Sequence, residues 1–347
     1  MVGGLVAFVI YLYFFIGIPK ILRVLSDINS SQYAFYYSLA LACVLASVFV
    51  WSTAWNSILR TLSINISYRN AYLYYWASYF ADLVLPCATL CGEITRLYLV
   101  EKETRKDYGI LAASAITNRI VAYAIVTIGL FTGATLIFLK PGISTVISNV
   151  FVLFLVAITV YMVALLYLAF VESAARNFSK LYGKIFRTLR PTKYQPESET
   201  QREISLAAYY TGFKKFRERP VLLIRPFVLH GISYLLGLFS YIFIFYALEI
   251  PSTPEFYVIV FFIATAVQDA VASFSVGSLD IILASIFILY GLNPGLSGIT
   301  ALLVRSVGFW FPLLMGFVAF QYLQTRNFIT QKQLEKSPRV RVDLPKQ

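Results

Sequence analysis

Long runs of apolar residues, separated by polar links, set the pattern of this chain. An α-helix needs about 20 predominantly apolar residues to cross the hydrocarbon layer of a bilayer. Six runs reach roughly that length, and we expect each of them to form one full span. They lie at residues 2–19, 33–55, 110–138, 146–171, 223–247 and 296–322. The pattern therefore predicts an all-α polytopic membrane protein.

Two further apolar regions, residues 70–99 and 256–291, are long enough for two passages each but are interrupted near the middle. Pro86 and the three residues after it interrupt the first, and the small residues from Ala272 to Ser278 interrupt the second. Non-helical backbone is tolerated at membrane depth only where protein or a wet cavity covers it. Both regions are therefore predicted to form re-entrant helical hairpins. The predicted tip residues are Pro86, Gly92, Gly277 and Ser278.

Ionisable residues recur at matched spacing within these apolar stretches. Glu93 lies 26 positions before Arg119, and Asp280 lies 25 positions before Arg305. A charge at the bilayer centre costs a few kcal/mol, so charges that are kept there indicate a functional site with named partners. Two such pairs at matched spacing predict a transporter built from internal repeats, with its site between them.

Composition and charge agree with this class, since 59% of the 347 residues are apolar and only 13% are charged. The formal net charge of +12 does not indicate nucleic-acid binding, because the basic residues fall in the links between apolar runs. The link at 173–222 carries eleven Lys or Arg residues and the tail after Gln321 carries six, so both are predicted to be cytoplasmic. The links at 139–145 and 248–255 carry a single Lys and are predicted to face outward.

This topology makes the first hairpin enter from the cytoplasm and the second from outside, so the two repeats are predicted to be inverted. They cover about residues 33–138 and 223–322 of a single membrane domain, residues 1–325. The tail, residues 326–347, is predicted to be cytoplasmic and disordered. The protein is expected in the cell membrane with both termini in the cytoplasm.

The basic link at about 173–222 is also amphipathic. Apolar residues recur at helical spacing between Arg176 and Arg190 and again between Leu206 and Arg217, with Lys and Arg in between. Two helices lying in the headgroup layer fit this pattern. They would anchor the protein on anionic lipids at the cytoplasmic surface, or they would gather an anionic lipid substrate.

Several short motifs follow one another in a recognisable order. The first half contains Asp82-Leu83-Val84-Leu85-Pro86, then Gly92-Glu93 with Arg96, then Asn118-Arg119; the second half has Gly277, Asp280 and Arg305. From about residue 35 to 322 this order resembles the membrane portion of the lysylphosphatidylglycerol synthases and their stand-alone, flippase-like relatives. The part after the last span is too short for the soluble aminoacyl-transfer domain of the synthases. The resemblance therefore implies lipid movement without lipid synthesis.

The chain departs from the family pattern at several of these positions. Asp82 stands where an Asn is usual, and Asn118 replaces the Glu before Arg119. In the second hairpin, Ser273 stands where a proline is expected, and Asp280 stands where a Glu is usual. Cys91 also replaces the first Gly of the family's Gly-Gly-Glu motif.

Arginine suits the transfer of a phosphate headgroup across a low-dielectric core, because it stays charged and binds phosphate through two parallel hydrogen bonds. Glu93 and Asp280 would neutralise the arginines in the empty state, bind a cationic headgroup, or take up a proton that drives transport, and the sequence leaves these alternatives open. Glu93 and Arg96, three apart on one helix face, would also fit a purely structural pair. The predicted translocation site comprises Glu93, Arg96, Arg119, Asp280, Arg305, Asp82 and Asn118.

The leading hypothesis is a lipid flippase or scramblase for an anionic, phosphate-bearing lipid. An aminoacylated or otherwise modified phospholipid and a sugar on a polyprenyl phosphate both meet this description. The alternative is a membrane-embedded glycosyl- or aminoacyl-transferase, or the membrane subunit of one, and a third is a non-transporting anchor for an enzyme. No catalytic residue, metal or cofactor is expected from the motifs, since the chain lacks a nucleotide-binding motif and a His-rich cluster. A homo-oligomer and a partner lipid-modifying enzyme are both left open.

Overall fold

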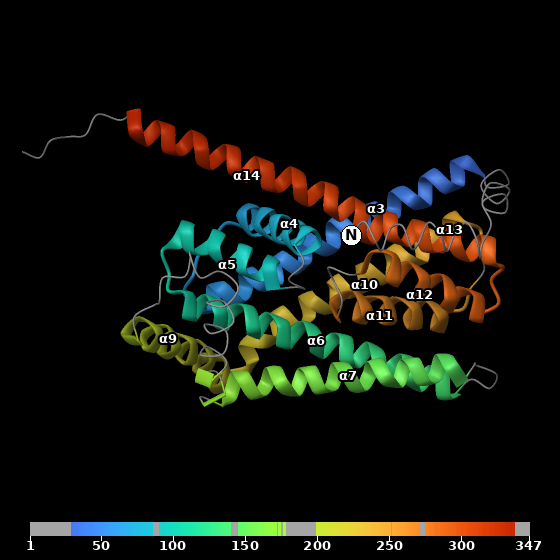
Figure 1. Ribbon diagram of the computed structural model, residues 1–347, viewed down its shortest axis with the longest axis horizontal. Coiled ribbons are helices and arrows are strands. Elements are labelled where there is room, and N and C mark those ends of the chain that lie inside the picture. Colours follow the sequence, from blue (N-terminus) through green and yellow to red (C-terminus); the bar gives the residue numbers. More distant parts are fainter. Residues whose placement is uncertain are drawn as a thin grey trace, which may run out of the picture.

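The computed structural model describes residues 29–85, 90–139, 145–171, 173–174, 176–177, 199–250, 252–270 and 275–336. Within these ranges every regular element is helical (Figure 1). The elements are α3 (Ser30–Thr61), α4 (Tyr68–Val84), α5 (Leu90–Thr104), α6 (Tyr108–Leu139), α7 (Thr145–Phe170), α9 (Glu199–Glu218), η2 (Pro220–Leu223), α10 (Ile224–Ala247), α11 (Pro254–Ala270), α12 (Ser275–Leu289), α13 (Pro294–Arg305), η4 (Ser306–Trp310) and α14 (Phe311–Lys336).

In the described part of the chain, four helical segments are long and apolar enough to cross a membrane, namely Ser30–Thr61, Tyr108–Leu136, Pro220–Ala247 and Pro294–Arg326. They coincide with four of the six predicted runs, which confirms the all-helical class. The run at 146–171 forms the single helix α7, and the run at 2–19 lies outside the described residues. Because α14 continues to Lys336, the prediction of disorder is wrong for residues 326–336, and residues 337–347 lie outside the described residues.

Local sequence explains where several helices begin. The side chain of Asn29 accepts hydrogen bonds from the backbone N–H groups of Ser31 and Gln32 at the start of α3. Ser67 caps α4 in the same way, and Asn293 caps α13, whose first residue is Pro294. Short polar side chains satisfy the free N–H groups of a first turn, and proline at the first helical position needs no partner for its nitrogen.

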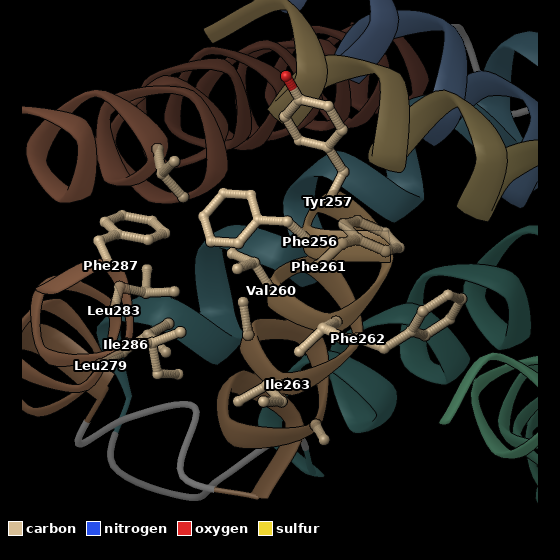
Figure 2. Close-up of a cluster of buried hydrophobic side chains, with 14 of the residues drawn as sticks. Phe256, Tyr257, Val260, Phe261, Phe262, Ile263, Leu279, Leu283, Ile286 and Phe287 are labelled. Carbon is tan, nitrogen blue, oxygen red and sulfur yellow. The ribbon is translucent and has the colours of Figure 1, made fainter. Parts of the chain in front are cut away.

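Each of the two interrupted regions forms two helices that fold back on one another. In the first, Asn70 of α4 donates to Glu103 of α5 at 3.0 Å, and near the break the Gly92 N–H donates to Asp82 at 2.6 Å. In the second, the ring of Phe256 near the start of α11 meets Tyr290, just after α12. Figure 2 shows the side chains of α11 and α12 turned toward each other in one buried cluster.

The last part of the second predicted break, residues 275–278, is helical. α12 begins at Ser275, so Gly277 and Ser278 lie in its first turn and not before it. Gly277 has a φ of +86°, a conformation that suits glycine because it has no Cβ. The small residues from 275 to 278 therefore start a helix, whereas their weak helix propensity alone had suggested a longer interruption.

The helices that precede the two hairpins, α3 and α10, run antiparallel side by side (Figure 1). Gln32 of α3 reaches the Tyr246 carbonyl near the end of α10, and Trp51 packs edge-on against His230 near its start. Residue numbers thus rise along one helix as they fall along the other. α3 and α10 therefore point in opposite directions.

Helices of one half also pack against helices of the other half. α4 of the first half lies on α14 of the second, and α11 of the second lies on α6 of the first. A Cβ at Gly316 of α14 would meet the Trp76 carbonyl in α4, and a Cβ at Gly129 of α6 would meet the Phe262 ring in α11. Gly129 and Gly316 are separated by 187 positions, the same separation as Glu93 and Asp280. Close helix contacts therefore occur at matching places in the two halves.

The second amphipathic segment of the basic link forms the helix α9. Tyr209, Phe213 and Phe216 are buried, and α9 packs mainly on α6. Protein therefore covers part of its apolar side, and its position in the headgroup layer stays a prediction. Periodicity alone cannot separate the two cases, since lipid and protein both favour an apolar face. The first segment lies largely outside the described residues.

Candidate functional site

Glu93 sits between two arginines and bridges them. Its Oε1 lies 3.0 Å from Nε of Arg119 in α6, and its Oε2 lies 2.8 Å from Nη2 of Arg96, one turn further along α5. The Glu93 side chain is 17% exposed, and those of Arg96 and Arg119 are 4% and 14% exposed. The structural pairing of Glu93 with Arg96 is thus present, and Arg119 is added to it. One carboxylate is thus shared by two guanidinium groups, and the Asp82 carboxylate lines the same cavity.

Aromatic side chains fix the positions of both arginines. The Arg96 guanidinium lies 4.3 Å from the ring centroid of Trp55 and 5.3 Å from that of Tyr75, which is cation–π geometry. Arg119 donates from Nη1 to the Tyr161 hydroxyl of α7 at 2.9 Å. The sequence analysis missed Tyr161, because a tyrosine in an apolar span gives no signal that separates it from the interfacial aromatic residues.

Asp82 joins the two arms of the first hairpin. Its Oδ1 accepts the 2.6 Å hydrogen bond from the Gly92 N–H at the start of α5. A Cβ at position 92 would run into the Asp82 carboxylate and the Ser78 carbonyl, so only glycine fits there. The predicted importance of Gly92 therefore has a steric cause. Pro86, the other predicted tip residue, lies outside the described residues.

Asn118 is held by the single histidine of the chain. Its Oδ1 lies 2.9 Å from Nε2 of His230 in α10, and both residues are buried. The ring of His230 also packs edge-on against Trp51 of α3. This arrangement fits a hydrogen bond that joins α6 and α10, and it places the Asn118 side chain beside Arg119.

The second acid–arginine pair repeats the geometry of the first. Asp280 Oδ1 lies 3.1 Å from Nε of Arg305, and its Oδ2 accepts a 2.8 Å hydrogen bond from the Gly277 N–H. A carboxylate that reaches back to the first turn of its own helix also satisfies a free N–H group there. Arg305 lies over the Phe309 ring at 4.3 Å, at the entry to the π-helical turn η4. Both residues are buried.

A partly open cavity of about 250 Å³ is lined by the first hairpin, by α11 and by neighbouring helices. Of the predicted site residues, those that line it are Asp82, Glu93, Arg96, Asn118 and Arg119. Its other walls carry hydroxyl and aromatic side chains from α3, α4, α6, α10 and α11. Asp280 and Arg305 do not line it, so the two pairs do not share one vestibule in this conformation. Within the described ranges, no group of three His, Cys, Asp or Glu residues could hold a metal ion.

Gln268 and Tyr79 are the other polar residues of interest that the sequence analysis missed. Gln268 Nε2 donates to the Tyr79 hydroxyl at 3.1 Å, and both side chains line the cavity. The contact joins α11 of the second half to α4 of the first. Gln268 could have been predicted as a site residue from the sequence, because it is a polar amide within a long apolar run.

A bundle of long apolar helices around buried, mutually compensated charges defines a multi-pass helical membrane protein. The chain belongs to the family described as "Lysylphosphatidylglycerol synthase TM region", whose model matches residues 1–316. This match confirms the resemblance inferred from the motifs.

Two archaeal proteins are similar to the chain over most of its length. UPF0104 membrane protein PH1989 of Pyrococcus horikoshii is 23% identical over 329 residues, which cover 90% of this chain and 92% of the relative. UPF0104 membrane protein MJ1595 of Methanocaldococcus jannaschii is 22% identical over 323 residues, which cover 90% of each. No solved structure matches the chain.

Proposed function

We propose that this protein is a lipid flippase or scramblase that moves an anionic, phosphate-bearing lipid between leaflets through the cavity beside Glu93, Arg96 and Arg119. The observation that carries the proposal is the position of this largely buried cluster, which lines a partly open cavity between helices of both halves. Ionisable groups inside a membrane domain mark substrate or ion pathways by default. The family membership agrees with a membrane function.

The cluster suits phosphate because its donors outnumber its acceptors. Glu93 offers two oxygens to two guanidinium groups, and Nε of Arg96 is buried with no acceptor among the described residues. Two phosphate oxygens match the forked donors of arginine. In the empty state Glu93 would neutralise both arginines, and an entering phosphate would take over part of these hydrogen bonds.

The arrangement of helices supports an inverted-topology repeat. α3 and α10 run antiparallel, and each half packs its first hairpin arm on the last helix of the other. We infer about six full spans and two re-entrant hairpins in one membrane domain, residues 1–325. In transporters of this kind, the substrate site lies where the two repeats meet.

The distribution of charge supports an orientation. α9, with Lys214, Lys215 and Arg217, lies at the same end of the molecule as the far end of α14 (Figure 1). Glu249 and Glu255 follow α10 at the opposite end. By the positive-inside rule the basic end faces the cytoplasm, which also holds both termini in this topology. We propose the cell membrane as the location.

Reconstitution into liposomes tests the function. Fluorescent phosphatidylglycerol and a lipid-linked sugar phosphate serve as probes, and a membrane-impermeant quencher reports which leaflet they occupy. We expect wild-type protein to move at least one probe and Arg119→Ala to abolish the movement. Lys214→Ala, which removes an exposed charge far from the cavity, is the matched control and should move lipid at the wild-type rate. A new lipid product detected by mass spectrometry would instead support a transferase.

A further inference from the structure

Arg305 uses only part of its hydrogen-bonding capacity. Its Nε faces Asp280, but no described residue accepts a hydrogen bond from Nη1 or Nη2, and both atoms are buried. The side chain is 4% exposed. Buried polar groups are normally paired, so two unpaired terminal nitrogens require an explanation. The same two nitrogens form the fork that binds two phosphate oxygens.

Arg305 lies directly behind the wall of the cavity. Tyr79 and Tyr241 both line the cavity, and both lie within electrostatic range of Arg305. Gly308, three residues after Arg305, lines the cavity as well, and a Cβ there would meet no atom within 4 Å. Arg305 therefore lies close to the cavity that holds Arg119 without lining it.

A hydrogen bond joins two residues of this wall. Gln268 of α11 donates to the Tyr79 hydroxyl of α4 at 3.1 Å, which links the first arms of the two hairpins. Tyr79 packs against the cluster formed by Leu83 and Phe309, and Phe309 in turn carries the Arg305 guanidinium on its face. A movement of the Tyr79 side chain away from Gln268 would therefore open a path from the cavity to Arg305.

Resting on the proposed function, we propose that the Tyr79–Gln268 contact is a closed gate between the cavity and a second anion-binding position at Arg305. The phosphate group of the lipid binds there after it leaves Arg119. Asp280 holds Arg305 in place through Nε and is itself fixed by the Gly277 N–H, so the second position is preformed. The adjoining π-helical turn agrees with this role, because such turns occur frequently at functional sites.

Chemical labelling of arginine tests the gate without any transport measurement. Protein in phosphatidylcholine nanodiscs is treated with phenylglyoxal, and peptide mass spectrometry gives the modification rates of Arg305 and Arg119. In the wild type, Arg305 should react more slowly than Arg119. Tyr79→Phe and Gln268→Leu should each raise the modification rate of Arg305 on the order of fivefold. The loss of one neutral hydrogen bond changes an equilibrium constant by about that factor. The double variant should add little, because both changes remove the same contact.

Thr265→Val is the matched control. Thr265 also lies on α11 and lines the cavity, but its hydroxyl bonds the Phe261 carbonyl of its own helix, so the Arg305 rate should stay at the wild-type value. The gate is overturned if Arg305 reacts as fast as Arg119 in the wild type, or if the two gate variants leave its rate unchanged. Far-ultraviolet circular dichroism and thermal midpoints establish that each variant is folded.

The ligand is tested in the Gln268→Leu variant. Phosphatidylglycerol added to the nanodiscs should slow the labelling of Arg305, and inorganic phosphate at the same concentration should not. Protection by inorganic phosphate alone, or by neither, overturns the lipid-phosphate position. The two proposals can fail separately. If lipid movement requires Arg119 but the labelling rate of Arg305 is the same in the gate variants as in the wild type, only the gate is contradicted. Liposomes in which wild-type protein moves no probe remove the proposed function, whatever the labelling shows.

Discussion

Arg119 Nε lies 3.0 Å from Glu93 Oε1, and this ion pair joins the second arm of the first hairpin to the helix that follows it. Arg305 and Asp280 repeat the relationship in the second half through the same arginine nitrogen, at 3.1 Å. The halves differ in one respect, since Glu93 is shared with Arg96. Of the two acid–arginine clusters, only the first lines the cavity.

Removing the shared carboxylate should destabilise the protein. Glu93→Gln leaves two largely buried guanidinium groups without their common partner, a change that typically costs about 3–5 kcal/mol. We expect a clearly lower thermal midpoint in detergent. The double variant Glu93→Gln/Arg119→Gln should recover part of this loss, because one unpaired charge has been removed with its partner. An unchanged midpoint in Glu93→Gln would show that the cluster is solvated and not buried.

The two matching glycines should respond unequally to a methyl group. Gly316→Ala should cost about 1–3 kcal/mol, because the added Cβ meets a backbone carbonyl that cannot move aside. Gly129→Ala should cost less, since the end of the Phe262 ring can shift. Gly231→Ala is the control: its Cβ would make an ordinary contact at 4.0 Å, so the change should be neutral or slightly stabilising. Thermal unfolding measures all three, and equal losses would contradict the close packing of α14 on α4.

Asp82 should govern the opening of the first hairpin. Asp82→Asn keeps an oxygen that can accept from the Gly92 N–H, whereas Asp82→Leu removes it. Hydrogen exchange followed by mass spectrometry should show faster exchange at the start of α5 in Asp82→Leu and nearly wild-type exchange in Asp82→Asn. Equal protection in the two variants would mean that this hydrogen bond does not hold the hairpin together.

The sequence predicted those features that depend on spacing along the chain. Apolar run lengths located the long helices, and the matched positions of Glu93, Arg119, Asp280 and Arg305 predicted two ion pairs that the structure contains. Features set by packing between distant segments were not predictable. The stacking of Arg96 on Trp55, the link of Tyr161 to Arg119 and the separation of Arg305 from the cavity depend on how helices are rotated against one another.

The amphipathic link shows a second limit of what sequence periodicity can predict. The pattern of α9 predicts one apolar face, and the structure has one, but the pattern carries no information on what covers it. Protein covers part of it here, through Tyr209 and Phe213 against α6.

The most direct test of the central claim is an electron cryomicroscopy map of the protein in nanodiscs that contain phosphatidylglycerol. The account predicts elongated lipid density that enters the bundle, with its headgroup in the cavity within hydrogen-bonding distance of Arg96 or Arg119. A map in which side chains fill that cavity, and lipid lies only along the outer surfaces of the helices, would contradict it.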